Sequence, residues 1–160
     1  MSPTAANSDA GRLKPGTPLH YFYRQLTVSP ASVKGVSLQG KTAIVTGANS
    51  GIGLATCRQL VQLGLSRLIL AVRNEEKGRA AATKLTSDLN LEPDTVHVWS
   101  LDLSSYDSII AFTNRVSSGL DRVDMVVLNA GMWSPLDRAF NQQTGHEEDI
   151  QVNYSKMVGI

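Results

Sequence analysis

The sequence holds a single cysteine, no long apolar run and almost no excess of charge. Cys57 alone cannot form an internal disulfide and suits a reducing compartment, so we expect a cytoplasmic protein. No apolar stretch approaches the roughly 18 residues that cross a bilayer, and the N-terminus has no basic region followed by an apolar one. A formal net charge of +1 gives no basic field for nucleic acid. We therefore expect no transmembrane segment, no secretion signal and no nucleic-acid partner.

The composition is that of a globular chain with one domain. With 160 residues, of which 42% are hydrophobic and 18% charged, it can bury a core. Residues 1–37 are rich in Ser, Pro, Ala and Gly and predict an irregular N-terminal arm, followed by a domain over 38–160. The apolar group of Tyr21, Phe22, Tyr23 and Leu26 either packs on the domain, forms a short helix or makes an aromatic contact patch.

Apolar runs and helical periodicities alternate along residues 38–160. The pattern predicts strands at about 41–46, 68–72, 95–100 and 123–128. It predicts helices at about 51–63, from Asn74 onward, from the Ser104–Asp107 capping box onward, and at 145–158. We expect Gly64 to end the first of these helices and Cys57 to be a small buried side chain within it. Such alternation favours an α/β fold with a parallel sheet and helices on both faces.

A glycine-rich stretch, Thr46–Gly53, connects the first predicted strand to the first predicted helix. Glycines allow a sharp turn and a close approach to a ligand, and the helix N-terminus favours an anion such as pyrophosphate. Its spacing matches neither the nucleotide-triphosphate loop nor the Gly-x-Gly-x-x-Gly fingerprint. The candidate cofactor-binding residues of this stretch are Gly47, Asn49, Ser50, Gly51, Ile52 and Gly53.

The pattern Thr-Gly-x-x-x-Gly-x-Gly resembles that of the short-chain dehydrogenase/reductase family. Three further matches extend the resemblance over residues 38–160: Leu101-Asp102-Leu103, Asn129-Ala130-Gly131 and Asn153 within Gln-Val-Asn-Tyr. The resemblance implies a Rossmann-type doubly wound parallel sheet, here incomplete, with strand order 3-2-1-4 and its ligand crevice at the carboxyl ends of strands 1 and 4.

The resemblance also implies roles for these residues. Asp102, with Leu103, would contact the adenine, and Asn129, Ala130 and Gly131 would lie beside the ribose. Asn153 would be the Asn of the catalytic tetrad, which holds a proton-relay water. The sequence departs from the family at Leu128, where an Asn is usual. The residues around Arg73 and from Asp102 to Phe112 resemble those of the retinol-dehydrogenase-like and fungal secondary-metabolite branches of the family.

Cofactor choice is indicated by the residue that follows the second predicted strand. A dinucleotide site usually has an acid about 20 residues beyond the glycines to bind the ribose hydroxyls. Here that position is Arg73, whose guanidinium can bind a 2′-phosphate, and Lys77 follows one helical turn later. The site is therefore predicted to prefer NADP over NAD, the alternative being a solvated arginine.

The chain lacks the residue pair that the family uses for hydride transfer. Four residues after its tyrosines stand Gln25, Thr27, Ile110 and Val158, so no Tyr-x-x-x-Lys occurs. We interpret the chain as the NADP-binding part of a truncated oxidoreductase, without the catalytic Ser, Tyr and Lys and inactive alone. The intact relative would interconvert a small-molecule carbonyl and an alcohol.

The sequence leaves two alternative functions and the oligomeric state open, and it bears on metal binding at one place. A non-catalytic nucleotide-binding module and a non-functional truncated product are the alternative functions, and a homo-oligomer is left open. The adjacent acids Glu147, Glu148 and Asp149 read as a solvated first helical turn. We therefore expect no metal site.

Overall fold

The computed structural model describes residues 16–28, 33, 35–133, 139–142 and 144–158, with the backbone alone over 155–158. The chain divides into two compact units, Met1–Gly35 and Val36–Ile160. The expectation of an irregular arm over residues 1–15 and 29–32 lies outside the described residues. The predicted division into 1–37 and 38–160 stays a prediction.

The first unit contains the helix α1, Pro18–Thr27. Thr17 is its N-cap, and the Thr17 hydroxyl accepts a hydrogen bond from the His20 N–H at 3.2 Å. A proline near the helix start is favourable because its missing N–H would have no helical partner there. The aromatic group Tyr21–Tyr23 therefore lies in a short helix, which was one of the three predicted alternatives.

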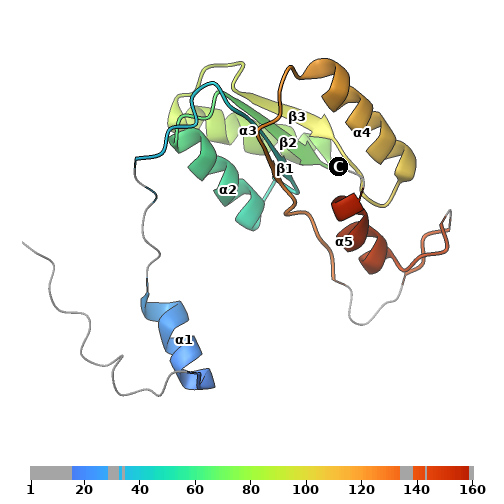
Figure 1. Ribbon diagram of the computed structural model, residues 1–160, viewed down its shortest axis with the longest axis horizontal. Helices are drawn as coiled ribbons and strands as arrows, with labels where there is room; N and C mark the ends of the chain where they lie inside the picture. The colour runs from blue at the N-terminus through green and yellow to red at the C-terminus, as the bar shows by residue number, and fades with distance from the viewer. Residues whose placement is uncertain (1–15, 29–32, 34, 134–138, 143, 159–160) are drawn as a thin grey trace, which may run out of the picture. The chain divides into compact units, whose positions relative to one another are not determined.

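The second unit is built on a four-stranded parallel sheet of order β3-β2-β1-β4 (Figure 1). Its strands are β1 (Thr42–Thr46), β2 (Arg67–Val72), β3 (Val96–Ser100) and β4 (Met125–Val127). Ala43 lies opposite Leu68 on one side and Met125 on the other. Strands β1 and β2 are almost wholly buried, as expected for parallel strands covered on both faces. The predicted Rossmann-type fold and its strand order are confirmed.

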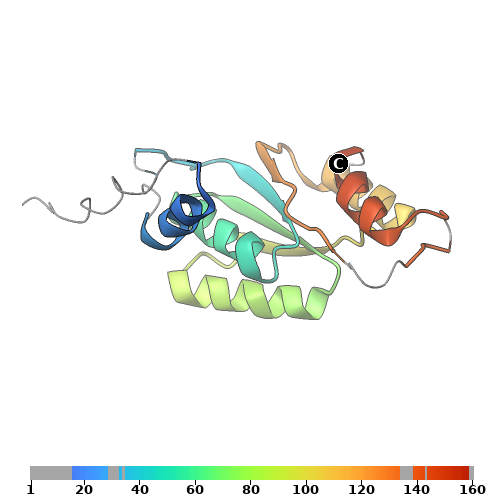
Figure 2. The ribbon, with the colours of Figure 1, turned by 90° about the horizontal axis from the view of Figure 1, so that it is seen from below.

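Helices cover the two faces of this sheet (Figure 2). α2 (Gly51–Gln62) and α3 (Glu75–Leu89) pack on one face, and α4 (Tyr106–Gly119) packs on the other. Val152 of α5 (Glu148–Val158) packs against the α4 side. Side chains therefore alternate along each strand: Ala43 and Val45 face α2 and α3, whereas Ile44 faces α4.

The core is apolar on both faces of the sheet. Cys57 is fully buried on the α2 side, as predicted, and burial raises the pKa of its thiol to about 12. On the α4 side Trp99 meets Phe112 edge to face, with ring centroids 5.9 Å apart. The Arg115 guanidinium lies 4.3 Å from the centroid of the Trp99 ring and covers its outer face.

The ends of the elements mostly follow the predicted signals. Gly64 ends α2 with φ +85°, and the Leu65 N–H donates to Leu60 O at 3.2 Å. Asn74 caps α3 by accepting from the Lys77 N–H at 2.9 Å. These bonds satisfy main-chain groups that have no partner within the helix.

Three predicted boundaries were wrong. Helix α5 begins at Glu148, three residues after the predicted start at 145. The N-cap of α4 is Ser105, because the Ser104 hydroxyl is already bonded to Asp102. Strand β4 is shorter than the predicted 123–128, because the Asn129 N–H turns back to the carbonyl of Val127 at 3.0 Å. The chain thus leaves the sheet before Leu128.

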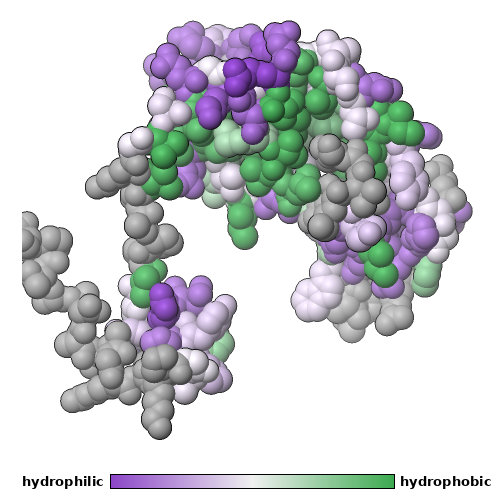
Figure 3. Space-filling model, in the orientation of Figure 1, coloured by the Kyte–Doolittle hydropathy of each residue, from purple (hydrophilic) through white to green (hydrophobic). Residues whose placement is uncertain are grey.

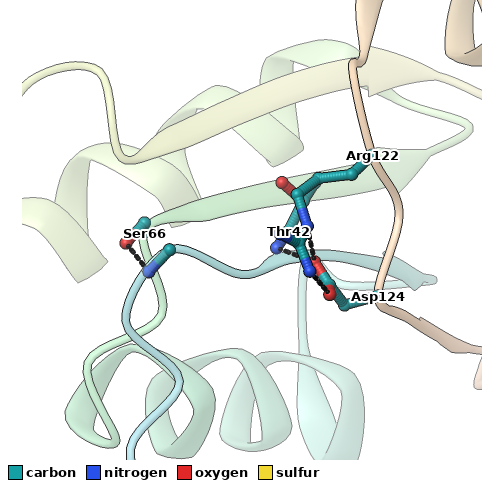
Figure 4. Close-up of polar contacts among 5 residues, drawn as sticks. Thr42, Ser66, Arg122 and Asp124 are labelled. Carbon is teal, nitrogen blue, oxygen red and sulfur yellow. Dashed lines mark hydrogen bonds and ion pairs between the residues drawn. The ribbon is translucent and has the colours of Figure 1, made fainter.

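A polar cluster fixes the beginnings of β1 and β4 (Figure 4). The Asp124 carboxylate accepts hydrogen bonds from the Thr42 N–H at 2.9 Å and from the Arg122 Nε at 2.9 Å, and Arg122 Nη2 also donates to it. The bonds from Arg122 are the main reason that the pKa of Asp124 is lowered. Nearby, the Gly40 N–H donates to the Ser66 hydroxyl at 2.7 Å.

The surface carries some apolar side chains near β4 (Figure 3). Val123, Val126 and Leu128 are 38%, 42% and 37% exposed. Among the described residues β4 pairs only with β1, so its other edge is open. Within the same residues, no helix has the length and apolar character needed to cross a membrane.

Candidate nucleotide-binding site

A pocket of about 360 Å³ opens where the carboxyl ends of the four strands meet. In a doubly wound sheet this is where a ligand binds, because the loops diverge there. Its walls come from the ends of β1 and β2 and the segments that follow the strands, together with one residue of α5. The lining residues are Thr46, Gly47, Asn49, Ser50, Ala71, Arg73, Leu101, Asp102, Leu103, Asn129, Ala130, Gly131, Met132 and Val152.

The glycine loop is packed tightly against the end of β4. Gly47 has φ +64°, and a Cβ built there would lie 2.8 Å from the Ala130 Cα. A Cβ on Gly53 would lie 2.5 Å from both the Gly47 carbonyl oxygen and the Asn129 Nδ2. The sequence predicted glycines for approach to a ligand. The structure shows that these two are required first for the loop to pack on the neighbouring strand end.

The side chain of Asn129 ties two strand ends together. Its Nδ2 donates to the carbonyls of Thr46 at 3.1 Å and Gly47 at 3.3 Å. The Ala130 N–H donates to the Thr46 hydroxyl at 3.0 Å. Asn129 thus reaches the pocket wall and also holds the glycine loop in place, a second use that the sequence did not indicate.

The N-terminus of α2 has main-chain donors without a side-chain cap. Ser50 is its N-cap residue, but the Ser50 side chain makes no capping hydrogen bond. In α1, α3 and α4 the caps Thr17, Asn74 and Ser105 each accept a main-chain N–H. The first turn of α2, at the pocket, is therefore suited to an anion.

The charged groups of the pocket are Arg73 and Asp102. Arg73 follows β2, is exposed and forms no ion pair with any described residue. Asp102 is held in a turn: its Oδ1 accepts from the Ser104 N–H at 2.9 Å and the Ser104 hydroxyl at 2.6 Å. One unpaired cation thus lies at the same pocket as one carboxylate that is already hydrogen-bonded.

Asn153 acts on the pocket through Met132. The Met132 N–H donates to the Asn153 Oδ1 at 3.1 Å, and the Asn153 Nδ2 donates to the Met132 carbonyl at 2.8 Å. The loop that follows β4 is therefore fastened to α5 by both ends of one amide. The predicted proton-relay role of Asn153 stays a prediction.

The structure separates the predicted site residues into two groups. Those in the pocket lining are Gly47, Asn49, Ser50, Arg73, Asp102, Leu103, Asn129, Ala130 and Gly131. The described lining does not include Gly51, Ile52, Gly53 or Lys77. Gly53 is buried beside the Gly47 carbonyl, Ile52 is 80% exposed, and Lys77 lies in the first turn of α3.

Sequence reasoning missed five lining residues: Thr46, Ala71, Leu101, Met132 and Val152. Thr46 and Leu101 already stand within the quoted motifs, and the other three lie within two residues of a predicted site residue, so taking whole motifs and widening them by two positions would have found all five.

Two of the three acids near α5 lie where the sequence placed them, whereas Glu147 precedes the helix and forms an isolated bridge with Phe140. Glu148 and Asp149 lie in the first turn of α5, where their negative charges interact favourably with the positive end of the helix dipole. Among the described residues, no group of three acids, histidines or cysteines is arranged to hold a metal ion.

The chain matches the short chain dehydrogenase family model over residues 41–159. It is 46% identical to the short-chain dehydrogenase fogG of Aspergillus ruber over 138 residues, which cover 85% of this chain and 39% of that protein. It is 45% identical to the short chain dehydrogenase virL of Hypocrea virens over 138 residues, covering 86% and 39%. A solved metagenomic short-chain oxidoreductase in complex with NADP is 32% identical with TM-score 0.56, covering 74% of this chain and 50% of that chain.

The four strands form an α/β doubly wound sheet with a pocket at their carboxyl ends, the place where proteins of this fold bind their ligands. The chain belongs to the short-chain dehydrogenase family, whose members use a nicotinamide cofactor and act on small molecules. The predicted resemblance, with its fungal relatives, is confirmed. The chain spans about 39% of the length of these two curated relatives.

Proposed function

We propose that this chain is the NADP-binding part of an oxidoreductase that interconverts a carbonyl and an alcohol. The observation that supports NADP is Arg73, the one cationic side chain among the described residues of the pocket lining. A guanidinium without an ion-pair partner can form charge-assisted bonds to a 2′-phosphate, whereas it cannot accept hydrogen bonds from the 2′- and 3′-hydroxyls of NAD.

The residues around the pocket fit the separate parts of this cofactor. The uncapped first turn of α2 provides main-chain donors for a pyrophosphate. Arg73 would bind the 2′-phosphate, with Lys77 adding charge from α3. Asp102 and Leu103 would hold the adenine, and the segment Asn129–Gly131 would lie beside the ribose. The bound cofactor would supply or accept the hydride.

The chain as it stands is proposed to bind without catalysing hydride transfer. None of its tyrosines is followed four residues later by a lysine, so the sequence has no pair to move the substrate proton. The family resemblance supports a proton-relay role for Asn153 in an intact relative, and in this chain its side chain fixes the loop beside the pocket.

Binding measurements on the Arg73→Asp variant test the proposal. We expect the parent chain to prefer NADP(H) over NAD(H) by about one to two decades in affinity, or roughly 1.5–3 kcal/mol. The acid should reverse this order, because it repels a 2′-phosphate and accepts bonds from ribose hydroxyls. Titration calorimetry with both cofactors measures the preference, and the same samples should not oxidise NADPH with a panel of ketones and aldehydes.

The matched control is Arg79→Asp, which makes the same charge change on α3 at a residue outside the pocket lining. It should leave the preference between the cofactors unchanged. Equal affinities in the parent would contradict the proposed cofactor, as would an unaltered preference in Arg73→Asp. Steady NADPH oxidation would contradict the proposed lack of catalysis.

A further inference from the structure

A chain of hydrogen bonds connects α5 to the turn that follows β3. Ser104 lies at its centre, and its main-chain carbonyl accepts from the Gln151 Nε2 at 2.6 Å and from the Asn141 Nδ2 at 2.8 Å. On its other side, the Ser104 N–H and hydroxyl both donate to Asp102, which lines the pocket. The turn therefore joins α5 to the edge of the nucleotide pocket.

Gln151 is buried, with 3% of its surface exposed, and both ends of its amide are bonded. Its Nε2 donates to Ser104, and its Oε1 accepts from the Thr144 hydroxyl at 2.5 Å. A buried amide that lost these partners would incur a desolvation penalty, so the two bonds fix where this side chain can lie.

The two residues that follow Gln151 both act on the pocket. Val152 is part of its lining, and Asn153 holds the main chain of Met132, which is also part of the lining. Gln151 itself is not a lining residue. Its side chain is therefore bonded to Ser104 and Thr144, while the next two residues of the chain form or hold a wall of the pocket.

We propose that Gln151 is a positioning residue of the nucleotide site, which holds α5 against the Asp102–Ser104 turn so that Val152 and Met132 form one wall of the pocket. The inference rests on the proposed function, since it assigns Gln151 to the same site. Asp102 keeps its bonds from Ser104, and Arg73 belongs to the loop after β2, whereas the bonds of Gln151 are to Ser104 and Thr144. A ligand that contacts only these loops should bind independently of Gln151, whereas a ligand that extends to α5 should not.

Gln151→Glu is the informative variant. The new carboxylate can still accept from Thr144, but it has no N–H for the Ser104 carbonyl and places a second acceptor against it. We expect NADPH to bind about tenfold more weakly, because a change of that size corresponds to the loss of about one hydrogen bond to a charged or buried group. Adenosine 2′,5′-bisphosphate, which has the adenine and the 2′-phosphate but no nicotinamide, should change by less than about twofold.

Gln142→Glu is the matched control, because it makes the same change at an exposed residue. Thr144→Val removes only the hydroxyl that donates to Gln151, and should weaken NADPH about threefold with the bisphosphate again unchanged. This second variant decides the matter if Gln151→Glu does not fold.

Calorimetry with both ligands separates the possible failures. If the parent and Gln151→Glu bind NADPH equally well, Gln151 is not a positioning residue and the proposed function stands. Equal weakening of NADPH and the bisphosphate would show a general structural role and overturn the inference. If the parent binds neither ligand, the proposed function fails and the inference fails with it.

Discussion

At the scale of single residues, the pocket is built by contacts between segments about 80 residues apart in the sequence. Gly53, at the start of α2, lies against the amide of Asn129 and the carbonyl of Gly47. The Asn129 side chain in turn bonds the carbonyls of Thr46 and Gly47. Any side chain at Gly53 has to displace main-chain atoms, which cannot move away as a flexible side chain could.

Gly53→Ala should therefore destabilise the domain although alanine is the better helix former. A Cβ at 2.5 Å from two polar atoms forces a backbone shift, at a cost of about 1–3 kcal/mol in the free energy of unfolding. Chemical denaturation measures the change. Gly119→Ala in α4 is the control, since its Cβ would meet the Trp99 ring at an ordinary 3.6 Å. It should be neutral or stabilising by up to about 1 kcal/mol. Equal stability of the two variants would contradict this account.

The sequence predicted where single residues lie better than it predicted the contacts that they make. The spacing of Gly47 and Gly53 marks the loop, because glycine-rich turns between a strand and a helix are recognisable locally. That Gly47 touches Ala130, and that Asn129 holds the loop, are contacts between distant segments. No local pattern encodes these distances. The place of Arg73 after β2, at the pocket, was predicted from spacing alone, because strand and helix lengths vary little in this type of sheet.

At the scale of elements, β1 and β4 are aligned by the carboxylate of Asp124. The carboxylate accepts a hydrogen bond from the Thr42 N–H, and the main-chain N–H of Asp124 donates to the Thr42 carbonyl at 2.9 Å. Arg122 neutralises it with two donors. This arrangement sets the register at the start of the strand pair, from which Ala43 meets Met125.

Asp124→Asn should lower the stability at neutral pH and change its dependence on acid. Because the pKa of Asp124 is lowered in the folded state, its ionised form stabilises the fold above its ordinary pKa of about 4. That contribution is lost as the pH falls through the lower folded pKa. Urea midpoints should therefore differ between parent and variant at pH 7, and converge as the pH falls below about 4.

Asp121→Asn is the control for this change, since Asp121 is an exposed neighbour. It should shift the urea midpoint little at either pH. A difference between Asp124→Asn and the parent that persists unchanged into acid would show that the charge of Asp124 does not stabilise the strand pair.

Element types were predictable from periodicity, whereas their ends were set by tertiary contacts. The buried runs of β1 and β2 and the faces of α3 and α4 read directly from the sequence, whereas α2 buries Gly53, Cys57 and Val61 and leaves Ile52 exposed. The end of β4 did not, because it depends on the bond from Asn129 back to Val127. The N-cap of α4 is Ser105 and not the predicted Ser104, because the Ser104 hydroxyl donates a hydrogen bond to Asp102.

At the scale of the whole molecule, the β4 edge of the sheet is open among the described residues. β4 has three residues, pairs only with β1 and is flanked by exposed apolar side chains. An edge strand presents unpaired N–H and C=O groups, which native proteins usually block with a charge, a proline or a bulge. Asp124 lies just before the strand but is engaged with Arg122.

The 160-residue chain should therefore associate through β4. Multi-angle light scattering should give a mass that rises with concentration, and Val126→Lys should reduce that rise, because a charge on an edge strand opposes pairing. Ile110→Lys on α4 is the control, as it replaces an even more exposed apolar residue away from the edge. A parent that stays a monodisperse monomer at all concentrations, with a sharp melt, would contradict the prediction.

The strand order came from the resemblance to a family, not from periodicity. Alternating strands and helices allow several parallel topologies, whereas the glycine loop and the Asn-Ala-Gly after the fourth strand specify this one. The contribution of α5 to the pocket was foreseen only at Asn153. The bonds of Gln151 to Ser104 and Thr144 depend on how α5 packs, and the sequence does not show that packing.

If the pocket binds a cofactor as proposed, the uncapped start of α2 would make that binding part of the stability of the fold. Ser50 provides no side-chain cap, so a bound anion would complete the first turn as a cap does elsewhere in the chain. A ligand that binds only the folded state adds RT ln(1 + [L]/Kd) to the free energy of unfolding, about 2.7 kcal/mol at a hundred times Kd. For a domain of this size that is a sizeable fraction of the typical total. The protein's resistance to heat and proteolysis would thus follow the concentration of its cofactor.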